Sequence, residues 1–246
     1  MTGLPVVLLH GARTSSTMWR AQQEALARAG RVALAPDLPG HGSRRGERFT
    51  LDGARVVVDE AADRVGGRAV VVGLSLGGYL AIDHAARRPD QVAGLVAAGC
   101  STSPGGPLTR GWRQAVRAIE RLPDGGAWLN QALVRRMLPA DGAADVAAGG
   151  FALDVMGDVI DEIGTLRPLR ELAEVSCPVW IVNGRWDHFR RQERAYLRAA
   201  TSAPRSRLVV VPGASHLVSL TRPAAFTRLL LDVVEECERS DRGPAT

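Results

Sequence analysis

The segment Gly73-Leu74-Ser75-Leu76-Gly77 places one hydroxyl between two glycines at two-residue spacing. A valine-rich run precedes it and a helical pattern follows it, so we expect Ser75 at a sharp turn from a strand into a helix. Glycines at both flanks relieve the crowding of such a turn, and the hydroxyl then stands clear of the sheet. The pattern predicts a serine nucleophile, and the alternative is a tight turn without chemistry.

A serine hydroxyl needs a base to accept its proton near neutral pH, and that base is usually histidine. His216 follows the last apolar run, in a glycine-containing loop before a helix. This position predicts a place at the carboxyl edge of a parallel sheet, where ligands of open α/β folds bind. The other four histidines fit structural roles better, in loops, in a helix or directly beside an acidic candidate: His10, His41, His84 and His188. We therefore predict His216 as the base.

The third member of such a site is a carboxylate that orients the imidazole and stabilises its cation. Asp187 follows the fifth apolar run and is the acid that we predict, the alternative being a turn acid or helix N-cap. Asp37, after the second run, is the main competitor, but its proline- and glycine-rich surroundings favour a loop anchor. Asp83 and Asp90 belong to the helix and turn after Ser75, where we expect surface positions.

Six short apolar runs alternate with helical patterns, which is typical of a parallel sheet covered by helices on both faces. The runs cover residues 5–10, 31–37, 69–74, 92–99, 178–184 and 207–212. Between them, apolar residues at a spacing near 3.6 predict helices over residues 19–29, 50–65, 76–88, 190–200 and 222–238. The fold class is therefore α/β, with a mostly parallel sheet of about six strands. Each of the three candidate residues then follows a strand.

Residues 104–168 interrupt this alternation, because they hold only helical segments separated by proline and glycine. We expect a core formed by residues 1–103 and 169–246, with a helical cap inserted at 104–168. Apolar cap residues are candidates for the wall of a substrate pocket: Trp112, Trp128, Leu129, Phe151, Leu153 and Met156. Such residues more often pack a subdomain core, so we expect one or two of them to face substrate.

Composition excludes several other classes of protein. A chain of 246 residues with 46% hydrophobic content can bury one large core. Its basic residues are all arginine and scattered, so the net charge of +5 predicts no nucleic-acid partner. Three distant cysteines predict neither a disulfide framework nor a metal site, and we expect no cofactor. The start of the chain runs almost directly into a strand and no run is long enough to cross a bilayer, so we expect a cytoplasmic protein with no membrane partner.

Together these residues resemble the α/β-hydrolase-fold serine hydrolases, which include esterase- and lipase-like enzymes with a helical cap. The order Ser75, Asp187, His216 matches the family's order of nucleophile, acid and histidine. The segments LLHGARTSSTMW at 8–19 and DLPGHGS at 37–43 also look like family signatures. The resemblance implies an oxyanion hole built from the backbone N–H groups of Leu76 and Ala12, with Arg13 as the fallback for Ala12.

The resemblance implies hydrolysis of an ester, lactone or thioester of a small, largely apolar substrate through an acyl-enzyme on Ser75. Arg13, near the oxyanion loop, is a candidate contact for an anionic substrate, although its sequence favours a solvated arginine. Two other functions stay open. One is a carbon–carbon bond hydrolase, lyase or cofactor-free biosynthetic enzyme on the same triad, and the other is a ligand-binding receptor with slow turnover. Fold analogy does not choose among them.

Overall fold

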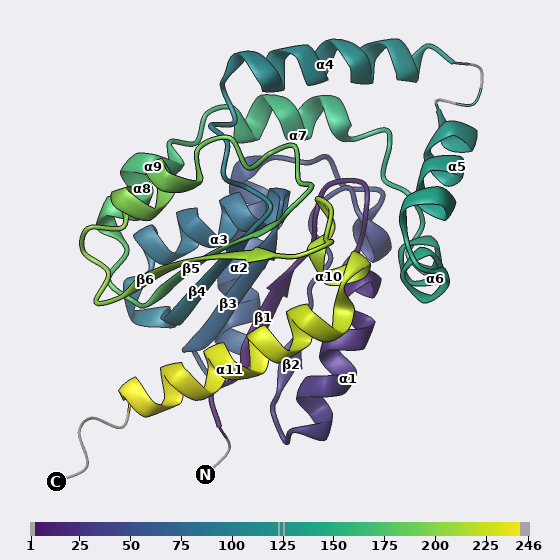
Figure 1. Cartoon of the computed structure of the whole chain (residues 1–246). Coiled ribbons are helices and arrows are strands. Elements are labelled where there is room, and N and C mark those ends of the chain that lie inside the picture. The colour runs from purple at the N-terminus through teal and green to yellow at the C-terminus, as the bar shows by residue number, and fades with distance from the viewer. Residues whose placement is uncertain (1–2, 123, 125, 242–246) are drawn as a thin grey trace, which may run out of the picture.

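The computed structural model describes residues 3–122, 124 and 126–241. At its centre lies a six-stranded sheet in the order β2-β1-β3-β4-β5-β6, in which all neighbouring strands are parallel (Figure 1). The strands are β1 (Val6–Leu9), β2 (Ala33–Leu34), β3 (Ala69–Leu74), β4 (Val92–Ala98), β5 (Val179–Gly184) and β6 (Ser206–Val211). All six predicted strands are present. The strand order reverses between β1 and β3, and ligands of open α/β sheets bind at such a switch point.

Both faces of the sheet are buried, which explains why its strands are continuous apolar runs. In β3, Val70 and Val72 pack on one face and Val71 packs on the other. The first face is covered by α1 (Arg20–Arg28) and α11 (Pro223–Asp241). The second is covered by α2 (Leu51–Arg64), α3 (Leu76–Arg87), α8 (Pro168–Glu174) and α9 (Glu193–Ala199). Short helical turns complete the core: η1 (Ser16–Trp19), η2 (Gly42–Arg44), η3 (Pro89–Gln91) and α10 (Val218–Thr221).

In the described residues between β4 and α8, where the sequence predicted a helical insertion, the structure has four helices. They are α4 (Pro107–Glu120), α5 (Ala127–Met137), α6 (Ala140–Ala148) and α7 (Met156–Ile163). Figure 1 shows α4 and α7 side by side above the sheet, and α6 contacts η1. Residues 1–2, 123, 125 and 242–246 of the predicted domain ranges lie outside the described residues.

The described part of the chain contains no helix of the length and apolarity needed to span a membrane. Within the same residues, no cluster of three or more histidine, cysteine, aspartate or glutamate side chains is arranged to hold a metal ion. The three cysteines, Cys100, Cys177 and Cys237, are buried free thiols.

Candidate active site

Three side chains from separate loops meet beyond the carboxyl ends of β3, β5 and β6. The Ser75 hydroxyl lies 3.0 Å from Nε2 of His216, and Nδ1 of the same ring lies 3.0 Å from Oδ1 of Asp187. An ionised carboxylate can only accept a hydrogen bond, so Nδ1 carries the proton and donates it to Asp187. In the neutral ring Nε2 then accepts from the Ser75 hydroxyl. The structure brings together the three residues that the sequence predicted.

Asp187 is held in its ionised form by its contacts. Asp187 is only 4% exposed to solvent, and burial by itself raises the pKa of its carboxyl group. The hydrogen bond from His216 and the one from the Phe189 N–H, at 2.8 Å, outweigh burial, so the pKa lies below its ordinary value. A negative charge is therefore present at neutral pH beside the imidazole that it orients.

The turn at Ser75 holds its backbone in a conformation that side chains rarely adopt, with φ 56° and ψ −112°. Its N–H donates to the carbonyl of Ala98 at 2.8 Å, which ties the turn to β4. A Cβ atom on Gly73 would lie 2.0 Å from the carbonyl oxygen of Gly77, and one on Gly77 would lie 2.1 Å from that of Leu9. Neither position can hold a side chain without moving the backbone. The two glycines therefore permit the close approach that exposes the hydroxyl.

Comparison with known proteins assigns this geometry to a family. The sequence model described as "Alpha/beta hydrolase family" matches residues 6–229. The chain belongs to the alpha/beta hydrolase family. Two proteins named pimeloyl-[acyl-carrier protein] methyl ester esterase are similar to it over nearly their whole length. The one from Nitrosomonas europaea is 30% identical, covering 91% of this chain and 93% of its own, and the one from Chromobacterium violaceum is 32% identical, covering 95% of each.

A solved structure of this alpha/beta hydrolase fold has a similar arrangement of elements. The thermophilic esterase from Thermogutta terrifontis, solved with malate bound, superposes with a TM-score of 0.76 at 24% identity, covering 96% of this chain and 91% of that one. The family match and the named relatives confirm the predicted class, an ester hydrolase of the alpha/beta hydrolase family.

Two backbone N–H groups belong to residues next to the serine in the chain or in the neighbouring loop of this hydrolase. Leu76 is the first residue of α3, directly after Ser75. Ala12 belongs to the loop after β1, whose Gly11 is so close to Ser75 that an added Cβ would lie 3.6 Å from the serine Cβ. Among the described residues, neither the Leu76 nor the Ala12 N–H has a hydrogen-bond acceptor. Both N–H groups therefore remain without an acceptor in the part of the chain that the structure describes.

The loop after β1 is held in place by His10. Its Nδ1–H donates to the Gly11 carbonyl at 2.9 Å, and its Nε2 accepts from the Leu38 N–H at 3.0 Å. Complete burial, together with the neighbouring His41, lowers the pKa of His10 to about 3. The ring is neutral at physiological pH, which suits its two bonds. His10 thus links the loops that follow β1 and β2.

Asp37 anchors the same two loops and does not join the triad. Oδ1 accepts the Ser16 N–H at 2.7 Å, and Oδ2 accepts both the N–H and the hydroxyl of Ser43 at 2.8 Å. Burial raises the pKa of this carboxyl, but the bonds from Ser16 and Ser43 outweigh it and the pKa lies below its ordinary value. The role of loop anchor is the one that its sequence favoured.

Substituting Asp37 with alanine is expected to lower the free energy of unfolding by about 2 kcal/mol at pH 7, because three donors lose a charged acceptor that is partly open to solvent. The folded-state pKa is depressed, so this stabilisation is complete above the unfolded pKa of about 3.9 and disappears as the pH falls through the folded value. Urea unfolding at pH 7 and at low pH measures the difference. The control is Asp52→Ala, whose exposed carboxylate pairs with Arg55 alone among the side chains that the structure describes. If the difference in free energy of unfolding between wild type and Asp37→Ala stays the same at low pH, Asp37 does not anchor these loops through its ionised carboxylate.

The helices of the insertion approach the loop after β1 through an apolar contact. Val116 of α4 packs with Met156 and Ile160 of α7, and both Ala12 and Trp112 lie against this cluster. Met156 and Trp112, two of the predicted wall residues, therefore lie near one of the free N–H donors.

The other predicted wall residues lie elsewhere. Phe151 packs against the core on the side of α1 and α11. Trp128 on α5 is 72% exposed, and we leave it out of the wall. Leu129 and Leu153 are partly buried.

Two aromatic side chains that the sequence reasoning did not assign to the site pack on the imidazole of His216. The ring centroids of His188 and Phe189 lie 5.2 and 4.9 Å from that of His216. Burial, followed by the neighbouring His216, lowers the pKa of His188, so this second ring is neutral. The only sequence signal was their position directly after Asp187.

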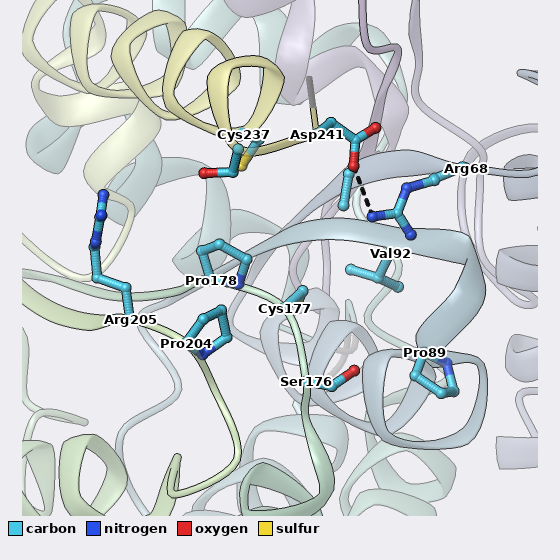
Figure 2. A pocket seen from close by; sticks show the side chains of 12 residues that line it. Arg68, Pro89, Val92, Ser176, Cys177, Pro178, Pro204, Arg205, Cys237 and Asp241 are labelled. Carbon is cyan, nitrogen blue, oxygen red and sulfur yellow. Dashed lines mark hydrogen bonds and ion pairs between the residues drawn. The ribbon is translucent and has the colours of Figure 1, made fainter. Parts of the chain in front are cut away.

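A cavity of 360 Å³ opens at the opposite end of the sheet, near the amino ends of β4, β5 and β6 (Figure 2). Figure 2 shows Cys177 and Cys237 in its wall, with Arg68 paired to Asp241 at one side. None of the triad residues lines it. The two thiols in its lining are not activated as nucleophiles, because burial raises the pKa of each to about 12.

Proposed function

We propose that this protein is a carboxylic ester hydrolase in which Ser75, His216 and Asp187 transfer an acyl group to water. The observation that carries the proposal is the continuous chain of contacts from the serine hydroxyl through the imidazole to a buried, ionised carboxylate. With Nδ1 directed at Asp187, the other ring nitrogen of His216 faces the serine hydroxyl, which is the arrangement that a general base requires.

In the first half-reaction, Ser75 Oγ attacks the ester carbonyl carbon while His216 Nε2 accepts the hydroxyl proton. The N–H groups of Leu76 and Ala12 stabilise the negative charge that develops on the carbonyl oxygen, and the amino end of α3 adds to this stabilisation. The bond from carbon to the alcohol oxygen then breaks. His216 returns the proton to the leaving oxygen, and an acyl-enzyme remains on Ser75.

In the second half-reaction, a water molecule replaces the alcohol. His216 accepts a proton from the water as its oxygen attacks the acyl carbon, and the same two N–H groups hold the oxyanion. The bond to Ser75 Oγ breaks, and the serine regains its proton from His216. The products are one carboxylic acid and one alcohol for each ester and water consumed.

Residues 104–168 act in this proposal as a cap over the acyl group. The apolar contact among Met156, Val116 and Trp112 reaches the loop that carries Ala12, so it favours an apolar acyl chain. A methyl ester of an acyl chain, the group named in the two curated relatives, is the first natural ester class to examine.

Labelling with a fluorophosphonate probe, together with assays of short- and long-chain aryl esters, lactones and thioesters, tests this proposal. We expect the wild-type protein to be labelled at Ser75 and to hydrolyse at least one ester. If the protein is not labelled and hydrolyses none of these compounds, the proposal fails. Labelling of Ser75 without turnover of any of them favours the receptor or the carbon–carbon hydrolase alternative.

A further inference from the structure

Arg13 shares a backbone property with the nucleophile. Among the described residues, Arg13, at φ 64°, and Ser75 are the two non-glycine residues with positive φ. Holding a residue with a side chain in this region costs on the order of 1 kcal/mol, and such strain is concentrated at functional sites. The reactive hydroxyl accounts for the strain at Ser75. The strain at Arg13 calls for a function of its own side chain, because glycine would fit this loop better.

The Arg13 guanidinium makes polar and aromatic contacts in the described part of the chain but no ion pair. Its Nη1 donates to Oδ1 of Asn130 at 3.2 Å, and it lies 5.9 Å from the centre of the Trp112 ring. No carboxylate whose side chain the structure describes is within ion-pair distance of it. Burial lowers the pKa of Arg13, although arginine stays charged at any physiological pH. A partly buried cation without a counter-ion is unfavourable unless a ligand supplies the charge.

This cation lies between the cap and the triad. Arg13 directly follows Ala12 in the loop whose Gly11 lies close to Ser75. Trp112, on which the guanidinium lies, has its ring centre 6.5 Å from that of His188, which in turn packs on His216.

Asn130 adds a second donor at the same place. Asn130 of α5 is 7% exposed, and its Nδ2 group has no hydrogen-bond partner among the described residues. The Asn130 amide group has no acceptor and the neighbouring Arg13 guanidinium has no counter-ion among the described side chains. Together they can bind the negatively charged oxygen atoms of a ligand.

We propose that Arg13 and Asn130 form an anion subsite, and that the preferred substrates are esters carrying a carboxylate in addition to the ester group, such as monoesters of dicarboxylic acids. This inference rests on the proposed function of Ser75. Arginine's planar donors match a carboxylate, and the low solvent exposure strengthens the interaction. The rest of the acyl chain lies against the apolar contact of Met156, Val116 and Trp112.

A purely structural role is the competing explanation, in which Arg13 fastens the cap through Asn130 and Trp112. Removing such a fastener changes the hydrolysis of charged and neutral esters by the same factor. Removing an anion subsite changes their ratio. The ratio of kcat/KM for a matched pair of esters therefore distinguishes the two roles.

The pair is a mono-aryl ester of adipic acid and its neutral aryl methyl diester, which differ by one methyl group and one charge. We expect the wild-type enzyme to prefer the anionic ester at least tenfold in kcat/KM. Arg13→Gln and Arg13→Gly should reduce this preference at least tenfold, mainly through KM, and Arg13→Lys should restore part of it. Asn130→Asp should also reduce it, because an introduced carboxylate neutralises the guanidinium.

The matched control is Arg191→Gln, because Arg191 is exposed and also lies near His188. It should keep the wild-type ratio. The melting temperature of Arg13→Gly should exceed that of Arg13→Ala, since only glycine relieves the positive φ.

A wild-type preference below twofold, a ratio unchanged by Arg13→Gln, or an equal loss in Arg191→Gln would overturn the subsite. Hydrolysis of the neutral diester in any of these cases leaves the proposed function intact. If neither ester is hydrolysed and Ser75 is not labelled, the proposed function itself has failed.

Discussion

Replacing Ser75 with glycine is expected to abolish ester hydrolysis and to yield a protein that melts above the Ser75→Ala variant. Without the hydroxyl no acyl-enzyme forms, and kcat should fall by about 10⁶-fold, the loss typical of serine hydrolases without their nucleophile. Both variants lose the contact with His216, but only glycine adopts φ 56° and ψ −112° without strain. The strain corresponds to about 1 kcal/mol or more, or about 2–4 °C in a domain of this size.

Steady-state assays of an aryl ester and thermal melts of wild type, Ser75→Ala and Ser75→Gly measure both effects. The alanine variant is the matched control, because it removes the same oxygen and keeps the strained backbone. Fluorophosphonate labelling should be absent from both variants. Activity retained in Ser75→Ala would refute the nucleophile, and equal melting temperatures would refute the strain at this turn.

Replacing Asp187 with asparagine is expected to lower kcat by about 10³- to 10⁴-fold with little change in KM. The amide keeps the shape of the carboxylate but presents either a neutral acceptor or an N–H group to His216 Nδ1. When the N–H faces the ring, Nδ1 becomes the acceptor and the proton moves to Nε2, which can then no longer accept from Ser75. The positive charge that develops on the imidazole also loses its partner. Steady-state kinetics with the same aryl ester measure the loss.

The matched control for this substitution is Asp83→Asn. Asp83 is also a buried aspartate, 3% exposed, and it pairs with Arg55 at 2.7 Å and with Arg87 at 2.9 Å, away from the triad. Burial raises the pKa of Asp83, but these arginines outweigh it and hold the pKa below its ordinary value. Asp83→Asn should lower stability and keep kcat near the wild-type value. A kcat of Asp187→Asn within tenfold of wild type would show that another group orients His216.

Sequence patterns predicted most of the fold, because the spacing of apolar residues depends directly on whether a helix or strand is buried on one face or on both. Strands buried on both faces read as valine-rich runs, and all six were found where these runs lie. Side-chain environment was harder to predict. Asp83 was expected at the surface, yet it is buried, because a single helical pattern does not show that Arg55 of α2 faces that position. Trp128 was a candidate for the pocket wall, yet it is exposed on α5.

The environment of Arg13, near the active site, was also not predictable from the sequence. Its sequence neighbours favoured a solvated arginine over a contact with substrate. The positive φ, the contact with Asn130 and the missing counter-ion depend on the loop after β1 meeting α4 and α5. These elements are far apart in the chain, so no local pattern reports their contact.

By itself the sequence determined the elements of this α/β fold, the glycine-flanked turn at Ser75 and the chain order of nucleophile, acid and histidine, because these depend on short-range steric and hydrophobic patterns. The sequence favoured Asp187 over Asp37 as the acid, but only the tertiary structure places one of these carboxylates against the histidine. β6 pairs with β5, so the loops that carry His216 and Asp187 are neighbours, while Asp37 follows β2 at the opposite edge of the sheet. Strand order sets these distances, and strand order arises from long-range packing.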